Sequence, residues 1–97
     1  MPQTVYTDAA VQGFVRRHCA VTLGIELAEI RLSQRFYDDL GMDSLDSVQL
    51  VMDLEKAYDI SMPDAEIYKF FRKQDGPTLQ DMVAYVSRKL SEAGKHV

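Results

Sequence analysis

The chain has 97 residues, a formal net charge of −4 and a hydrophobic content of 46%, which predict one soluble domain with a modest core. Eight acidic residues against one lysine between positions 38 and 64 make the middle acidic and disfavour nucleic acid, which binds basic surfaces. A single cysteine excludes an internal disulfide and a cysteine-rich metal site. With no signal-peptide pattern and no apolar run of membrane-spanning length, we expect a cytoplasmic protein without membrane insertion.

The first helix is expected to begin at Thr7 or Asp8 and to end at Gly24. A capping hydroxyl precedes an acid in the first turn, and glycine commonly follows a helix end. Apolar side chains recur between these points at helical spacing: the stripe comprises Val11, Phe14, Val15, His18 and Val21, with Cys19 and Leu23 at its edge. Because adjacent helical residues point about 100° apart, His18 and Cys19 are not expected to form a nucleophile pair.

Helical periodicity fades from residue 25 to residue 42, which predicts a long ordered loop with a short turn near Ala28 and Glu29. A connection of this length with little secondary structure is uncommon and often functional. We expect Phe36 and Leu40 to reach the core, while Asp38 and its acidic neighbour stay in solvent. The loop must return the chain so that the next helix runs roughly antiparallel to the first.

The next helix is predicted from Asp43 or Ser44 to Tyr58 or Asp59, and it carries two apolar stripes. One stripe comprises Ser47, Leu50, Val51, Leu54 and Tyr58. The other comprises Leu45, Val48 and Met52, flanked by Asp46, Gln49, Asp53 and Glu55. A surface helix of a small domain normally has one stripe. We therefore expect the first to face the core and the second to remain exposed for a partner.

Two further helices complete the predicted fold. Pro63, followed by acids, begins a short helix that reaches Phe71, and residues 72–77 form a polar loop with a Gly-Pro pair. Thr78, with an acid three residues later, begins the last helix, whose apolar stripe ends at Leu90. The prediction is an all-α domain spanning residues 1–97: a small up-and-down bundle of three main helices and a short one, with a long first loop and loose termini at 1–6 and 91–97.

The run Gly41-Met42-Asp43-Ser44-Leu45 resembles the Asp-Ser-Leu motif of acyl carrier proteins. Flanking segments extend the resemblance from about residue 11 to residue 90: Leu23-Gly24-Ile25, Phe36-Tyr37-Asp38-Asp39-Leu40-Gly41, Leu50-Val51-Met52 and Ile60-Ser61-Met62-Pro63-Asp64. The resemblance implies a carrier, not an enzyme, with a 4′-phosphopantetheine arm joined to Ser44 by a phosphodiester. The arm's thiol would hold an acyl group as a thioester. Asp43 would present the motif or cap the helix, whose N-terminus favours the negative phosphodiester.

With this resemblance, the exposed stripe becomes a docking face for successive enzymes. Leu45, Val48 and Met52 would form its apolar centre, and Asp46, Asp53 and Glu55 an acidic rim. The implied partners are a phosphopantetheinyl transferase and acyl-activating, condensing and other acyl-processing enzymes with basic docking patches. Such charge complementarity gives fast, salt-sensitive association. We expect a monomer that serves fatty-acid, polyketide or specialised lipid synthesis.

The chain departs from the family's usual pattern in two places. Gln49 stands where the family usually has an acid, and Asp53 is expected to compensate in part. The passage 67–78 is longer than usual and contains Tyr68, Phe70, Phe71, Arg72 and Lys73. In the family this passage borders the acyl cavity, so these aromatics are expected to enlarge, reshape or plug it. The added length resembles specialised carriers more than the housekeeping fatty-acid carrier, and it leaves the cargo open.

Four alternatives are weighed against this prediction. A peptidyl carrier of nonribosomal synthesis would hold an amino acid on the same arm, but such domains typically have Gly or His in place of Asp43. A serine hydrolase needs a histidine that is held by an acid. The only histidines are His18, inside a predicted helix, and His96, on the tail, so this alternative is disfavoured. The acidic spacing does not match a calcium-binding EF-hand loop, so no metal is predicted. A carrier-like domain that is never modified is disfavoured by the intact Ser44.

Overall fold

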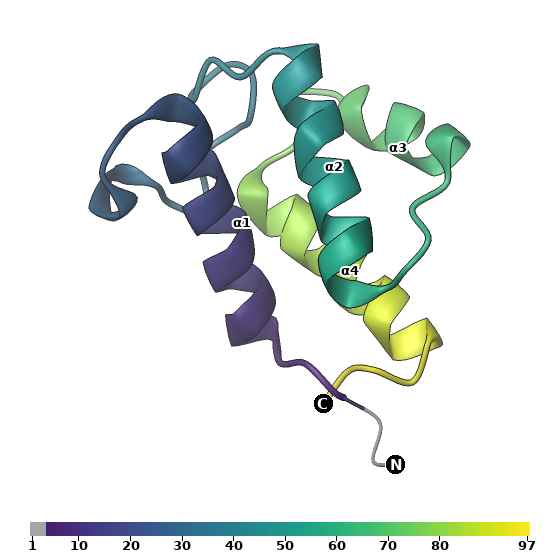
Figure 1. Cartoon of the computed structure of the whole chain (residues 1–97). Helices are drawn as coiled ribbons and strands as arrows, with labels where there is room; N and C mark the ends of the chain where they lie inside the picture. Colours follow the sequence, from purple (N-terminus) through teal and green to yellow (C-terminus); the bar gives the residue numbers. More distant parts are fainter. Residues whose placement is uncertain (1–3) are drawn as a thin grey trace.

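The computed structural model describes residues 4–97, which fold into four α-helices and one 3-10 turn (Figure 1). Their bounds are α1 Asp8–Leu23, η1 Leu27–Glu29, α2 Ser44–Tyr58, α3 Asp64–Phe71 and α4 Leu79–Glu92. Extended pairing within the described residues is confined to two isolated bridges, so the all-α prediction is confirmed. α1 and α2 run antiparallel, α4 passes behind them, and α3 lies beside α2 (Figure 1). No helix of residues 4–97 is long and apolar enough to cross a membrane.

The helices begin at the residues that their local sequence predicts, and α1 ends at the predicted glycine, whereas α4 continues two residues beyond Leu90 to Glu92. The Thr7 hydroxyl accepts a hydrogen bond from the N–H of Ala10 at 3.1 Å and caps α1. At α4, Thr78 and Asp81 each accept from the other's backbone N–H, at 3.1 Å and 2.9 Å, and complete a capping box. Gly24 ends α1 with φ +67°, a left-handed conformation that glycine adopts without steric cost.

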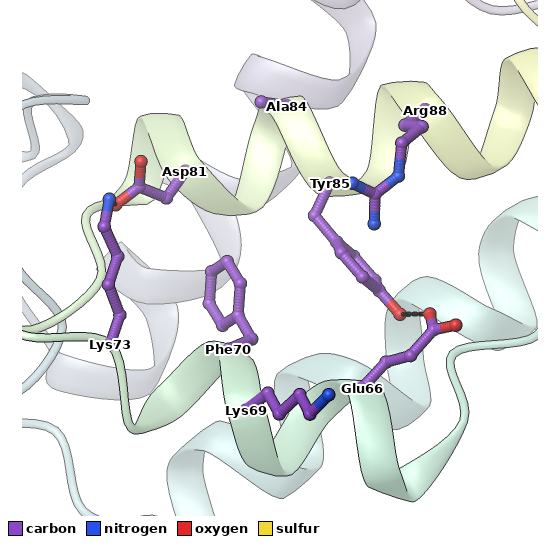
Figure 2. A pocket seen from close by; sticks show the side chains of 8 residues that line it. All are labelled: Glu66, Lys69, Phe70, Lys73, Asp81, Ala84, Tyr85 and Arg88. Carbon is purple, nitrogen blue, oxygen red and sulfur yellow. Dashed lines mark hydrogen bonds and ion pairs between the residues drawn. The ribbon is translucent and has the colours of Figure 1, made fainter.

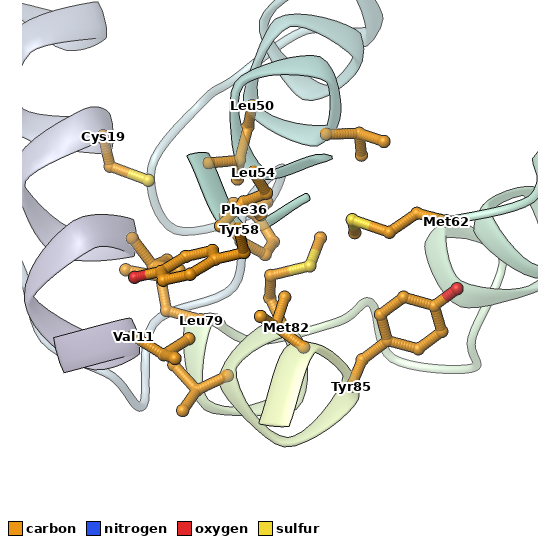
Figure 3. Close-up of a cluster of buried hydrophobic side chains, with 14 of the residues drawn as sticks. Val11, Cys19, Phe36, Leu50, Leu54, Tyr58, Met62, Leu79, Met82 and Tyr85 are labelled. Carbon is orange, nitrogen blue, oxygen red and sulfur yellow. The ribbon is translucent and has the colours of Figure 1, made fainter. Parts of the chain in front are cut away.

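The hydrophobic core lies where α1, α2 and α4 meet (Figure 3). The inward stripe of α2 is buried along its whole predicted length: Ser47, Leu50, Val51, Leu54 and Tyr58. Phe36 is fully buried, as predicted, whereas Leu40 is only half-buried. The last helix contributes Leu79, Met82, Val83, Val86 and Leu90. The core therefore depends most on α2 and α4, which bury nearly complete faces.

The buried stripe of α1 is rotated relative to the prediction. Val11, Val15 and Cys19, spaced four residues apart, are fully buried. Val21 is 83% exposed and lies on the solvent side, because two residues from Cys19 correspond to about 200° around a helix. Burial raises the pKa of the Cys19 thiol to about 12, so it stays protonated at neutral pH and acts as a small apolar side chain.

The loop between α1 and α2 is ordered because it supplies hydrogen-bond acceptors to the start of α4. The N–H of Leu79 donates to the carbonyl of Gln34 at 3.0 Å, and the N–H of Gln80 donates to that of Leu32 at 2.9 Å. N–H groups at the start of a helix have no acceptor within the helix itself. The loop thus joins two parts of the chain that are distant in sequence and fixes the approach to α2.

The chain ends are paired with each other, which the expectation of loose termini at 1–6 and 91–97 did not include. The N–H of Tyr6 donates to the carbonyl of Lys95 at 2.7 Å, and the N–H of Val97 to that of Tyr6 at 3.0 Å. The Lys95 ammonium also donates to the carbonyls of Tyr58 and Asp59, at the end of α2. The polar tail is held because it satisfies these carbonyls. Residues 1–3 of the expected terminus lie outside the described residues.

We expect Leu54→Ala to lower the free energy of unfolding by about 2–5 kcal/mol, because it removes a fully buried side chain from the core. The measurement is the urea unfolding midpoint followed by circular dichroism. Val48→Ala, on the exposed side of the same helix, should change the free energy by less than about 0.5 kcal/mol. Equal losses in the two variants would contradict the assignment of the two faces of α2.

Candidate functional site

Ser44 is the first residue of α2 and follows a turn built by Gly41 and Met42. Gly41 has φ +68°, a conformation that residues with a side chain rarely adopt. Apart from its chain neighbours, no atom lies within 4 Å of the position that a Cβ would take there. Met42 is only 4% exposed and anchors the turn in the core. The Ser44 side chain is exposed, so the turn presents it beside open backbone.

A capping box of two carboxylates fixes where α2 begins. The N–H of Asp46 donates to Asp43 Oδ1 at 2.8 Å, and the N–H of Asp43 donates to Asp46 Oδ2 at 3.1 Å. The N–H groups of Ser44 and Leu45 lie in the first turn of α2, where the helix itself offers no acceptor. They have no acceptor elsewhere in residues 4–97. They therefore leave positive partial charge next to the Ser44 side chain.

Of the two serines in the first turn of α2, only Ser44 is accessible. Ser47 is 3% exposed, its Oγ donates to the carbonyl of Asp43 at 3.1 Å, and it lies 2.9 Å from the Tyr37 hydroxyl. The Ser44 hydroxyl makes no hydrogen bond within the described part of the chain. Ser47 is thus a buried structural hydroxyl, whereas the Ser44 side chain is exposed.

The outward stripe of α2 is exposed as the sequence predicts. Leu45 is 78% exposed, Val48 53% and Met52 55%. Three large apolar side chains on one face of one helix form a contiguous patch, whereas exposed apolar residues are usually scattered singly. The side chains lie directly after Ser44 in the sequence and on the face of α2 that is turned away from the core. This arrangement suits a surface that another protein covers.

Asp53, beside this stripe, is held by two partners that the sequence did not predict. Its Oδ2 lies 2.7 Å from His18 Nε2 on α1, and its Oδ1 accepts a hydrogen bond from Gln49 Nε2 at 2.9 Å. The hydrogen bond from His18, and secondarily that from Gln49, lowers the pKa of Asp53. Gln49 therefore orients the carboxylate instead of only removing a charge. The contact with His18 depends on the register of α1 against α2, which no local pattern reveals.

Glu55 also has an internal role. It is half-buried, and its Oε2 accepts a hydrogen bond from the N–H of Met62 at 2.9 Å. Met62 lies in the extended segment before α3 and is buried. Glu55 thereby stabilises the path between α2 and α3. Among the predicted docking residues, it therefore supports the fold as well.

Two of the three aromatic residues of the passage 67–78, Phe70 and Phe71, join a continuous cluster of rings, whereas Tyr68 is 62% exposed. The rings of Phe70 and Phe71 lie 5.0 Å apart. Phe71 also contacts Phe36 at 5.9 Å and Tyr37 at 5.7 Å, while Phe70 contacts Tyr85 at 5.8 Å. Such ring pairs contribute stability in addition to that from the apolar surface that they bury. Aromatic rings therefore occupy the space between α3, α4 and the turn that precedes Ser44.

The histidines lie away from Ser44. His18 contacts Asp53, and His96 Nε2 lies 2.6 Å from Asp8 Oδ1. The hydrogen bond from His96 lowers the pKa of Asp8. Neither histidine contacts the Ser44 hydroxyl in residues 4–97, so the arrangement does not provide the base that a serine nucleophile needs.

Comparison with known proteins identifies the class of this domain. Residues 13–86 match the family model described as a phosphopantetheine attachment site. The chain is 43% identical to the acyl carrier protein of Clostridium acetobutylicum over 70 residues, which cover 72% of this chain and 83% of that protein. It is 35% identical to the acyl carrier protein of Akkermansia muciniphila over 82 residues, 84% of this chain and 95% of that one. The class is that of phosphopantetheine-bearing carrier domains.

Within that class, the chain belongs to the acyl carrier protein family. It is a carrier and not a catalyst, and it carries acyl groups on a covalently attached 4′-phosphopantetheine. When bound, this group supplies a thiol that holds the acyl group as a thioester. Its partners are accordingly a phosphopantetheinyl transferase and acyl-processing enzymes.

We expect His18→Ala to raise the pKa of Asp53, because the hydrogen bond from His18 is the main cause of its lowering. The pKa of Asp53 is depressed in the folded state, so this contact stabilises the fold above the unfolded value of about 3.9 and is lost as the pH falls through the folded value. A carboxyl carbon NMR titration measures the shift. Gln49→Ala should raise the pKa less, and an unchanged pKa in His18→Ala would contradict the contact.

Proposed function

We propose that Ser44 carries the 4′-phosphopantetheine arm. The observation that supports this assignment is the difference between the two serines of the first turn. Ser44 is exposed and its hydroxyl is unbonded within residues 4–97, while Ser47 is buried and hydrogen-bonded on both sides. A transferase can reach only the first of these hydroxyls without unfolding the turn.

The residues around Ser44 fit a phosphodiester-linked arm. The unbonded N–H groups of Ser44 and Leu45 and the N-terminal end of the α2 dipole favour a negative group at this position. Asp43 holds the helix start through its hydrogen bond with the N–H of Asp46, and it thereby keeps the Ser44 hydroxyl outward. The open backbone at Gly41 leaves space for the arm to depart.

The outward face of α2 is the proposed docking surface for the partner enzymes. Leu45, Val48 and Met52 provide its apolar centre, and Met52 adds a side chain that adapts to partners of different shape. Asp46, Gln49, Asp53 and Glu55 surround this centre. The charges of the three acids attract basic patches over a distance and speed the encounter. A small patch with a charged rim favours short-lived complexes, which a carrier needs.

The proposed cargo is an acyl intermediate of fatty-acid, polyketide or specialised lipid synthesis, handled in the cytoplasm by a monomeric carrier. The Asp43-Ser44-Leu45 motif supports acyl over aminoacyl cargo. The ring contacts of Phe71 with Phe36 and Tyr37 support a specialised cargo, because rings occupy the interior beside α3. Parallel loading assays with acyl-activating and aminoacyl-activating enzymes test this choice.

We expect Ser44→Ala to stay unmodified when it is co-expressed with a broad-specificity phosphopantetheinyl transferase, because the variant has no hydroxyl to accept the arm. Intact mass spectrometry measures the added group. Ser47→Ala is the matched control and should gain the arm, since the Ser47 hydroxyl is buried. A modified Ser44→Ala protein, or an unmodified parent protein, would contradict the assignment.

We expect Leu45→Ala and Met52→Ala each to raise the KM of arm transfer about five- to tenfold, because a central apolar contact in an interface contributes at least about 1 kcal/mol. Steady-state kinetics with the purified transferase measure the change. Leu27→Ala is the control: Leu27 is 40% exposed but lies on η1, outside the docking face. If KM rose equally in all three variants, the prediction that the α2 face binds the transferase would be contradicted.

A further inference from the structure

A groove of about 460 Å³ lies between α3 and α4 and shares no residue with the proposed docking face of α2 (Figure 2). Phe70 projects from α3 into the groove, and Tyr85 extends across it from α4 (Figure 2). The Phe70 ring is half-buried and contacts the Tyr85 ring at 5.8 Å. The apolar part of the groove is therefore formed by two aromatic side chains from different helices.

Polar contacts at both ends hold the groove in shape. At one end, Lys73 of the loop after α3 pairs with Asp81 of α4 at 2.9 Å. At the other end, the Tyr85 hydroxyl donates to Glu66 Oε1 at 2.6 Å, and Lys89 pairs with the same carboxylate at 2.7 Å. The two helices are thus joined on both sides of the aromatic pair. A preformed groove loses little conformational entropy when a ligand binds.

Two cations remain available at this groove. Lys69 of α3 and Arg88 of α4 are exposed, and neither forms an ion pair within residues 4–97. The Arg88 guanidinium lies 5.3 Å from the centre of the Tyr85 ring, which holds it over the aromatic surface. The two cations lie on opposite walls of the groove, Lys69 on α3 and Arg88 on α4 (Figure 2). The available charge here is positive, opposite to that of the α2 face.

We propose that this groove is a second docking site, which takes an acidic segment of a partner protein. A large apolar side chain of that segment would contact the Phe70 and Tyr85 rings. Its neighbouring carboxylates would pair with Lys69 and Arg88. The site does not depend on Ser44 or on the arm, and it would let one carrier contact a basic enzyme surface through α2 and an acidic segment through α3 and α4. Two linked contacts bind more tightly together than either alone.

The surroundings of the groove favour a protein segment over other anionic partners. Nucleic acid binding draws on several cations along a phosphate backbone, whereas here two free cations stand in a chain of net charge −4. A membrane surface is bound by apolar side chains that protrude from a basic face. The rings of Phe70 and Tyr85 are instead recessed, the first half-buried and the second buried. A recessed aromatic surface with opposed cations matches an anchor side chain flanked by carboxylates.

The test is a titration of the isotope-labelled carrier with an acetylated, amidated Glu-Glu-Leu-Phe-Glu-Glu peptide, followed by amide NMR shifts. We expect saturable shifts at residues 66–73 and 81–88, with a Kd of about 1 mM or tighter at low salt, and no shifts at residues 44–52. Rising sodium chloride should weaken binding, because the contacts are charge-assisted and exposed. Lys69→Glu and Arg88→Glu should each weaken it about tenfold, because each places a like charge against the peptide.

Matched controls separate this site from general charge effects. Arg31→Glu makes the same charge change at an exposed loop residue outside the groove and should bind the peptide as the parent does. A peptide with alanine in place of Leu and Phe should lose the shifts. Absence of saturable shifts, shifts centred on α2, or equal weakening by Arg31→Glu would overturn the proposal. Anionic phosphatidylglycerol vesicles that bind through the same residues while the peptide does not would assign a membrane instead.

Because the groove variants leave Ser44 untouched, intact mass spectrometry should show the arm on both Lys69→Glu and Arg88→Glu after co-expression with the transferase. Circular dichroism checks that both variants retain the parent's helicity. A failed peptide titration with normal arm transfer would overturn the second docking site alone. A failed transfer to the parent protein would instead count against the assignment of Ser44.

Discussion

Asp43 and Asp46 exchange hydrogen bonds through their side chains and backbone N–H groups, and this exchange sets the first residue of α2. If α2 began one residue later, its side chains would be rotated by about 100° around the helix axis relative to the turn that precedes it. Such a rotation would turn the Ser44 hydroxyl toward a different neighbour and move Leu54 out of the core. The positions of Ser44, of the buried face and of the exposed face are therefore consequences of one local set of hydrogen bonds, supported by the burial of Met42 just before them.

The acidic side chains around the proposed docking face are held in place by internal hydrogen bonds and are still accessible to a partner. Asp53 is oriented by His18 and Gln49, and Glu55 by the N–H of Met62, yet both side chains remain partly exposed. Oriented side chains lose less rotational freedom when a partner binds. The same hydrogen bonds connect α2 to α1 and to the segment before α3. The proposed docking face is thus flanked by residues that also maintain the packing of the bundle.

The features that were predicted correctly from sequence are those that local spacing controls. The caps at Thr7 and Thr78 and the division of α2 into two faces follow from residues within one or two turns of each other. The errors arise where tertiary packing decides. Val21 lies outside the core because α1 turns another side inward, and the tail is ordered because Lys95 reaches carbonyls at the end of α2. At the candidate site, the prediction of Ser44 rests on its motif, whereas the contact of His18 with Asp53 joins residues 35 positions apart and follows from no local pattern.

The pairing of Tyr6 with Lys95 and Val97 brings both ends of the described chain together at the far end of α2 from Ser44 (Figure 1). In this arrangement, the bundle has one pole at Ser44 and a tethering pole at the paired chain ends. A neighbouring domain or an affinity tag joined at either end would extend from the tethering pole and leave the first turn of α2 unobstructed. Adjacent termini also tolerate being joined to each other. The fold is therefore suited to insertion into a larger assembly without any change to the first turn of α2.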